Sequence, residues 1–312
     1  MAIILSIKER VKKKLTVILP YLFMLRPYQW SKNLLLFTGL IFSTSFFVRN
    51  DLLISILAFV IFCITSSGIY ILNDLRDINH DRLNPAKMNR SLAAGKISKL
   101  KAVIIMILLL AASVISAFIL DKNFFIIILM YLCLNVAYSF GLKNIVLLDA
   151  MIVSIGFLLR VFAGCVIIHV EVTPWLFICT FSLALTLSFG KRRTELNELK
   201  QEAKKFRGTL EFYSTQLLDI ILTICSATAI VTYSLYTMSN ETVQRFGNQN
   251  LIITMPFVMY GIFRFLYLIY TKNKGGDPTK LLLLDFPSLL NGALWIASIF
   301  YIIYGRSHFF YI

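Results

Sequence analysis

The sequence has few charged residues for its length. Only 15% of its 312 residues are charged, 58% are hydrophobic, and the mean hydropathy is +0.77. This composition excludes a water-soluble globular domain, in which about a quarter of the residues carry charge. The apolar runs are continuous and do not alternate with polar positions, so they favour helices over a barrel. The sequence therefore predicts an all-α integral membrane protein.

Cysteine is scarce and lacks the spacing of a metal or disulfide framework. The five cysteines all fall inside apolar runs and are interpreted as small core residues. The N-terminus also lacks the charged, apolar and small-residue order of a secretory signal. We expect residues 1–25 to form an interfacial segment, and residues 1–312 to form a single polytopic domain.

Apolar runs of about 20 residues give the number of expected spans. Nine such runs occur, at residues 34–48, 52–72, 102–120, 124–140, 147–168, 174–189, 220–238, 251–270 and 289–304. They predict a helical bundle.

Lys and Arg are distributed unevenly between alternate loops. With these spans, 25 of the 31 Lys and Arg residues lie on one side and four on the other. Cytoplasmic loops retain positive charge, so the N-terminus is predicted in the cytoplasm and the C-terminus outside, in an inner or plasma membrane. Insertion topology and anionic lipid explain the net charge of +15, and no nucleic-acid partner is expected. Three long cytoplasmic segments, at residues 73–101, 190–219 and 271–288, predict one cytoplasm-facing site.

Acidic residues are few, yet three of them recur at helical spacing after the second run. At about 100° per residue, Asp74, Asp77 and Asp81 fall within about 60° of one another on one helix face. Carboxylates so close together repel one another unless a cation binds them. Oxygen ligands select a hard cation, and Mg²⁺ is the one that also bridges phosphate oxygens. The alternative is a solvated helix end paired with Arg76 and Arg82.

Cationic residues follow the acidic triplet directly. Lys87 and Arg90 lie in the next loop. Cations beside a metal site suit a polyphosphate substrate.

These motifs resemble a known family. The pattern NDxxDxxxD at residues 73–81, the loop with Lys87 and Arg90, and the nine-span plan are similar to the UbiA-type prenyltransferase superfamily. Four further segments resemble its decaprenyl-phosphate phosphoribosyltransferase branch: RPYQWSKN at 26–33, YSFGLK at 138–143, GKR at 190–192 and GGDPT at 275–279. Ser91 and Asn84 depart from the pattern, since many relatives have Pro and His there.

The resemblance implies an activity and a site. The branch transfers 5-phosphoribose from phosphoribosyl diphosphate to a polyprenyl phosphate and releases diphosphate, with Mg²⁺ held by Asp74, Asp77 and Asp81. The remaining expected site residues contact the substrates, and they are Lys32, Asn73, Arg82, Lys87, Arg90, Tyr138, Lys143, Arg160, Lys191, Arg192 and Glu195.

The end of the sixth run separates this branch from ordinary prenyltransferases. Those enzymes usually carry a second Asp-rich motif there, whereas this chain has Lys191, Arg192 and Glu195. A donor with a 5-phosphate needs extra cationic ligands, which Lys191 and Arg192 could supply. The alternative is a basic face beside anionic lipid. Arg160, within a span, is expected to hold the lipid phosphate or to pair with a carboxylate.

Two other functions stay open. A prenyltransferase would share the metal site and move a polyprenyl chain from its diphosphate to an aromatic acceptor. A transporter would use the acidic cluster for ions. The sequence leaves the lipid chain length and any homo-oligomer undetermined.

Overall fold

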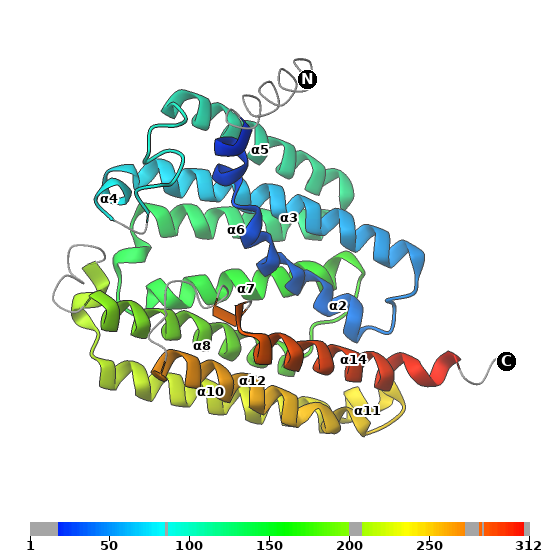
Figure 1. Cartoon of the computed structure of the whole chain (residues 1–312). Helices are drawn as coiled ribbons and strands as arrows, with labels where there is room; N and C mark the ends of the chain where they lie inside the picture. The colour runs from blue at the N-terminus through cyan, green and yellow to red at the C-terminus, as the bar shows by residue number, and fades with distance from the viewer. Residues whose placement is uncertain (1–17, 85–86, 200–207, 272–280, 283, 309–312) are drawn as a thin grey trace, which may run out of the picture. The chain divides into compact units, whose positions relative to one another are not determined.

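The protein is helical throughout the part of the chain that the structure describes. This computed structural model describes residues 18–84, 87–199, 208–271, 281–282 and 284–308, and all regular elements within them are helices (Figure 1). Eight of these helices are long and apolar enough to cross a membrane. The prediction of an all-α membrane protein is confirmed.

The eight spanning helices match eight of the nine expected runs. They are α3 (Arg49–Arg76), α5 (Lys99–Leu120), α6 (Lys122–Phe140), α7 (Leu148–Ile167), α8 (Pro174–Leu199), α10 (Thr215–Met238), η5 with α12 (Asn250–Thr254 and Met255–Thr271) and α14 (Phe286–His308). Large apolar side chains such as Leu108 and Ile119 of α5 are exposed. Lipid is the solvent that makes such exposure stable.

The first expected run is not one continuous helix. Residues 18–25 are helical, Arg26 has a φ of +53°, and the 3₁₀ helix η1 (Pro27–Leu36) leads into the short helix α2 (Phe37–Phe42). Pro27 explains the break, because a proline disfavours the α conformation at the residue before it. The nine-run count therefore corresponds to eight spanning helices and this broken segment.

The chain divides into two compact units. The first takes its described residues from Met1–Leu34 and Leu57–Phe140, and the second from Leu35–Ile56 and Gly141–Ile312. In the first unit, α5 packs against α6, and Met24, Ile71 and Leu92 belong to one buried core. In the second unit, α8 packs against both α7 and α10.

Two glycines allow the closest approach in the second unit. A Cβ atom at Gly164 of α7 would lie 1.7 Å from the carbonyl oxygen of Leu36, and one at Gly39 of α2 would lie 2.9 Å from backbone atoms of Cys165. Small residues at membrane helix contacts let backbones approach in this way. They fix α2 against α7.

Helix α8 is longer than the sequence indicated. The span was expected to end at residue 189 and a loop to begin at 190, but α8 continues to Leu199. No proline or glycine follows Gly190 within this extension to stop the helix. Lys191, Arg192 and Glu195 therefore lie on a helix and not in a loop.

Candidate active site

The three aspartates of the first unit do not lie on one uninterrupted helix. Helix α3 ends at Arg76, and α4 (Ile78–Leu83) begins after Asp77, whose φ and ψ are −96° and 8°. The continuous face assumed from the sequence is thus broken at Asp77. Asp74 and Asp81 are buried, with exposed fractions of 4% and 3%, and Asp77 is half-buried.

Two arginines hold the buried carboxylates. Nη1 of Arg90 lies 3.1 Å from Oδ1 of Asp74 and 2.6 Å from Oδ2 of Asp81. Nη2 of Arg26 donates to the same Oδ1 atom of Asp74. The order Arg26, Asp74, Arg90, Asp81 is therefore a row of alternating charge, which we call the acidic-arginine row.

The two arginines that the alternative interpretation paired with these aspartates, Arg76 and Arg82, have other contacts. The guanidinium of Arg76 lies 4.7 Å from the centre of the Phe140 ring. Nε of Arg82 donates to the carbonyl oxygen of Ala93 at 3.2 Å. Arg82 thus contacts the loop that carries Arg90 and fixes its path.

The loop after α4 places Arg90 by several local bonds. The amide of Arg90 donates to the carbonyl of Lys87 at 2.9 Å, and the hydroxyl of Ser91 donates to the carbonyl of Pro20 at 2.7 Å. Leu92 is 1% exposed in the core of the unit. Gly95 has a φ of +70°, which suits glycine and turns the chain toward α5. Lys87, at the start of this loop, is half-buried.

Polar side chains bind the broken N-terminal segment to α3. The indole of Trp30 donates to the hydroxyl of Ser67 at 3.0 Å, and that hydroxyl lies 2.9 Å from the carbonyl of Leu25. Irregular backbone persists in membrane proteins where protein groups satisfy it. Lys32, on η1, is half-buried.

Helix α6 carries one expected residue, Tyr138, and contacts a second, Asn73 of α3. The hydroxyl of Ser139 donates to the side-chain oxygen of Asn73, which ties α6 to the end of α3. Tyr138, next to Ser139, is half-buried. Lys143 lies on the 3₁₀ helix η2 (Leu142–Asn144), which belongs to the second unit.

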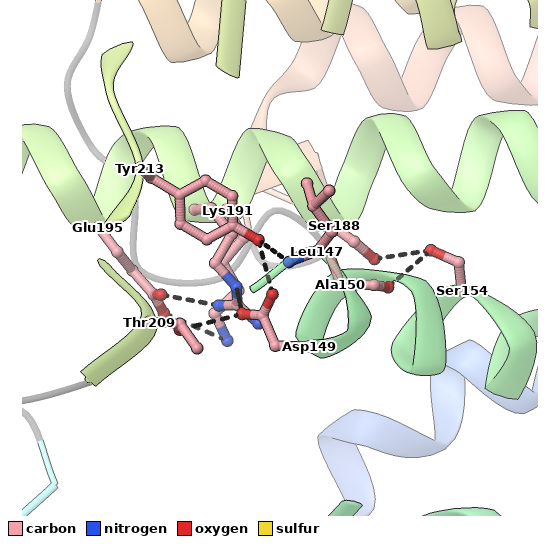
Figure 2. A network of polar contacts seen from close by, with 10 residues as sticks. Leu147, Asp149, Ala150, Ser154, Ser188, Lys191, Glu195, Thr209 and Tyr213 are labelled. Atoms are coloured by element: carbon pink, nitrogen blue, oxygen red, sulfur yellow. Dashed lines mark hydrogen bonds and ion pairs between the residues drawn. The ribbon is translucent and has the colours of Figure 1, made fainter. Parts of the chain in front are cut away.

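The second unit has its own charged network, at the end of α8. Nε of Arg192 donates to Oδ2 of Asp149 at 2.7 Å, and its Nη1 donates to Oε2 of Glu195 at 2.8 Å. Nζ of Lys191 lies 3.8 Å from Oε1 of Glu195, one helical turn away. Figure 2 shows Asp149, Glu195 and Tyr213 converging here.

Tyr213 completes this network. Its hydroxyl donates to Oδ1 of Asp149 at 2.8 Å and accepts the amide of Leu147 at 2.7 Å (Figure 2). Leu147 has a φ of +68°, a costly conformation that this bond helps to hold. Burial, and then the hydrogen bond to Asp149, raise the pKa of Tyr213, so the phenol stays a donor at physiological pH.

Asp149 was missed by the sequence reasoning. It is fully buried in the first turn of α7, and Thr209 also donates to its Oδ2 atom at 3.4 Å. A signal was present, since Asp149 is a carboxylate inside an expected span, where such groups are costly and usually have a role.

Arg193 was also missed, and its partners differ from those of Arg192. It donates from Nε to Oδ1 of Asp219 on α10, and its guanidinium lies 3.7 Å from the centre of the Tyr270 ring. The three consecutive basic residues of α8 therefore differ in access. The Lys191 side chain is 39% exposed, those of Arg192 and Arg193 are 3% and 10%.

Arg160 is buried in α7, with an exposed fraction of 5%. Its Nη1 donates to the carbonyl of Gly156, one turn earlier, and its guanidinium lies 5.6 Å from the centre of the Phe157 ring. The segment at residues 275–279, whose sequence resembles the branch, lies outside the described residues.

The acidic-arginine row partly fits a metal site. Among the described residues, no group of three His, Cys, Asp or Glu residues has the arrangement of a metal site. However, Oδ1 of Asp74 and Oδ2 of Asp81 both lie within hydrogen-bond distance of one nitrogen atom, Nη1 of Arg90. A hard cation with two carboxylate oxygens can complete its shell with water and phosphate oxygens.

Comparison with known proteins identifies the family. The model of the UbiA prenyltransferase family matches residues 33–285. The chain belongs to this family. A decaprenyl-phosphate phosphoribosyltransferase of Mycolicibacterium smegmatis is 34% identical over 221 residues, which are 69% of each chain. The protein of that name from Mycobacterium tuberculosis is 28% identical over 279 residues, 88% of this chain and 91% of the other.

A solved structure shares the UbiA fold. A UbiA homologue from Archaeoglobus fulgidus bound to GPP and Mg²⁺ superposes with a TM-score of 0.67 at 21% identity, covering 91% of this chain and 99% of the homologue. The helical membrane bundle that the sequence predicted therefore has the UbiA fold.

Proposed function

We propose that this UbiA family member transfers 5-phosphoribose from phosphoribosyl diphosphate to a polyprenyl phosphate and releases diphosphate. An oxygen of the lipid phosphate forms a bond to the anomeric carbon of the ribose. The bond from that carbon to the diphosphate oxygen breaks, and diphosphate leaves with the electron pair.

The observation that carries this proposal is the basic end of α8. Lys191, Arg192 and Arg193 occur in sequence there, where a second Asp-rich motif would suit a prenyl diphosphate and its metal. The phosphoribosyltransferases named above match most of the chain, which supports the same donor. A donor with phosphate at both ends gains from cationic ligands.

The proposed site residues lie in both units. In the first unit, Asp74, Asp77 and Asp81 are the residues that would hold Mg²⁺, and Lys32, Asn73, Arg82, Lys87, Arg90 and Tyr138 contact or position the donor. When bound there, Mg²⁺ would neutralise charge on the departing diphosphate. In the second unit, Lys191 and Lys143 bind phosphate oxygens. Arg192 and Glu195 orient Lys191, and Arg160 serves the lipid phosphate.

The site faces the cytoplasm in this proposal, because the basic loops lie on that side. Cysteines introduced at Asn89 and Asn248 test the orientation in a chain whose exposed Cys133 has been replaced by alanine. A membrane-impermeant thiol reagent should label the Asn89 position only from the cytoplasmic side and the Asn248 position only from outside. Labelling of both positions from one side would contradict the proposed topology.

The reaction itself is tested with purified protein, polyprenyl phosphate and labelled phosphoribosyl diphosphate, followed by lipid extraction. Label should enter the lipid fraction, and EDTA should prevent it. Asp74→Asn and Asp77→Asn should each lower turnover by at least about a hundredfold, as removal of one stabilising group commonly does. The protein should still insert and remain helical by circular dichroism. Wild-type rates for both variants, or full activity in EDTA, would overturn the metal assignment.

A prenyltransferase is the other candidate, favoured by the solved relative whose title names GPP and Mg²⁺. A parallel reaction with a polyprenyl diphosphate and a hydroxybenzoate separates the two. If the protein ignores phosphoribosyl diphosphate and prenylates the aromatic acceptor, the donor assignment is wrong.

A further inference from the structure

Arg26 occupies an unusual position for a cation. It lies at the break between the helix of residues 18–25 and η1, with a φ of +53°. A non-glycine residue in this region costs free energy and usually has a local reason. The reason here is the side chain, because its Nη2 atom reaches Oδ1 of Asp74 on α3.

The surroundings of Arg26 hold its guanidinium at this carboxylate. The group lies 5.3 Å from the centre of the Tyr70 ring, one turn before Asp74 on α3, and the side chain is 13% exposed. The Asp74 side chain is 5% exposed. A carboxylate so buried needs a counter-ion, and Arg26 supplies one.

Arg26 and Arg90 share one oxygen atom of Asp74, and they differ in access. Oδ1 of Asp74 accepts from both, while Arg90 also bonds Asp81 and is 29% exposed. A divalent cation that takes Asp74 and Asp81 as ligands competes for the same oxygens. Two arginines beside a bound cation would be repelled by it, and a polyphosphate would attract them.

We infer that Arg26 is the resident counter-ion of Asp74, which gives way when a divalent cation binds and then binds the diphosphate of the donor. The second half of this inference rests on the proposed function. Arg26 thereby has opposite effects on two binding equilibria. It weakens cation binding in the free protein and strengthens binding of the cation with diphosphate.

The first test measures cation binding without any substrate. The full chain in lipid nanodiscs is titrated with Mn²⁺, and free Mn²⁺ is followed by electron paramagnetic resonance. Arg26→Gln should bind Mn²⁺ at least about fivefold more tightly than wild type, because an adjacent cation changes the proton affinity of a carboxylate by about one to three logarithmic units. Arg26→Lys keeps the charge and should stay within about twofold of wild type.

Arg76→Gln is the matched control. It removes the same charge from the same unit, two residues from Asp74 in the sequence, and its guanidinium contacts Phe140. Its Mn²⁺ affinity should change by less than about twofold, since exposed charges are screened. An equal rise in Mn²⁺ affinity in Arg26→Gln and Arg76→Gln would mean that only the net charge matters, and it would overturn the inference. So would unchanged or weaker Mn²⁺ binding in Arg26→Gln.

The second test measures inorganic diphosphate binding by isothermal titration calorimetry at saturating Mg²⁺. Arg26→Gln should weaken it by about tenfold, in the opposite direction to its effect on Mn²⁺. Unchanged diphosphate affinity would overturn the role of Arg26 as a ligand. Neither measurement uses phosphoribosyl diphosphate or polyprenyl phosphate, so failure of the proposed reaction is seen separately, in the lipid-extraction assay. Helix content and elution volume confirm that each variant is folded.

Discussion

The two units both pair arginines with buried aspartates, but they leave those arginines with different freedom. In the acidic-arginine row, the side chains of Arg26 and Arg90 are 13% and 29% exposed and share one carboxylate oxygen. At the end of α8, Arg192 is 3% exposed and bonds two different carboxylates, while Asp149 also accepts from Tyr213. The divalent cation that we propose displaces the first kind of pair. The second kind is a fixed part of the fold.

The difference between the two units changes the roles that we assign to the basic residues of α8. The sequence suggested that Lys191 and Arg192 act together as phosphate ligands. With Nε and Nη1 of Arg192 bonded to Asp149 and Glu195, its contribution is to place Glu195, which in turn lies beside Lys191. Lys191 has the most exposed side chain of the three basic residues, and it is the one that we propose binds phosphate.

Arg192→Ala should have the largest effect on stability. It leaves Asp149 charged and buried, and loss of one partner of a buried pair costs about 3–5 kcal/mol. Thermal unfolding in detergent, followed by circular dichroism, should show a much lower Tm. Arg76→Ala, which removes a cation of the first unit, is the control and should stay near the wild-type Tm. A wild-type Tm for Arg192→Ala would mean that the ion pair of Arg192 and Asp149 is broken as easily as the ion pairs of the acidic-arginine row.

Lys191→Ala should have a smaller effect, on substrate binding. A half-exposed contact to phosphate contributes about 1 kcal/mol, so KM for phosphoribosyl diphosphate should rise about three- to tenfold. KM for polyprenyl phosphate and the Tm should stay near wild type. The paired measurement of both KM values checks this, with Arg245→Ala, expected on the opposite side of the membrane, as the control. An equal rise in both KM values would contradict a donor-specific role.

The pair of Arg264 and Asp285 gives the smallest expected effect. Nε and Nη2 of Arg264 bond the two oxygens of Asp285 at 2.9 and 2.8 Å. The Arg264 guanidinium holds the pKa of Asp285 well below its usual range. A lowered pKa stabilises the fold above the unfolded-state value of about 4 and loses that contribution as pH falls below it.

Asp285→Asn should therefore lower the Tm slightly at pH 7 and flatten its decline below about pH 4. Thermal unfolding at a series of pH values measures this, with the exposed Glu241→Gln on α11 (Asn240–Phe246) as control. An unchanged acid decline in Asp285→Asn would mean that this pair contributes nothing to stability.

Most of the fold could be predicted from the sequence, because the length of an apolar run decides whether it forms a membrane-spanning helix. Eight of nine apolar runs became helices long enough to span a membrane, since a bilayer forces every backbone group into an internal bond. The broken N-terminal segment was not predicted. Pro27 marks it, but the polar groups of Trp30 and Ser67 that make the break tolerable come from separate parts of the chain.

The candidate site was predictable only as a set of residue types. The spacing of Asp74 and Asp81 is a local property, and it remains an expectation that they hold a metal. Their partners are not local, because Arg26 lies 48 residues before Asp74 in the chain and Arg90 lies 16 after it.

The sequence by itself determined that this protein is a membrane-spanning helical bundle with acidic and basic clusters after its second and sixth apolar runs. Hydrophobic length and charge are read residue by residue, and lipid enforces the rest. The tertiary structure decided which arginine meets which aspartate. It bonds Arg192 to Asp149 and Glu195, whereas Arg26 and Arg90 share one carboxylate oxygen of Asp74. Such differences in burial and in partners arise only when distant segments of the chain pack together.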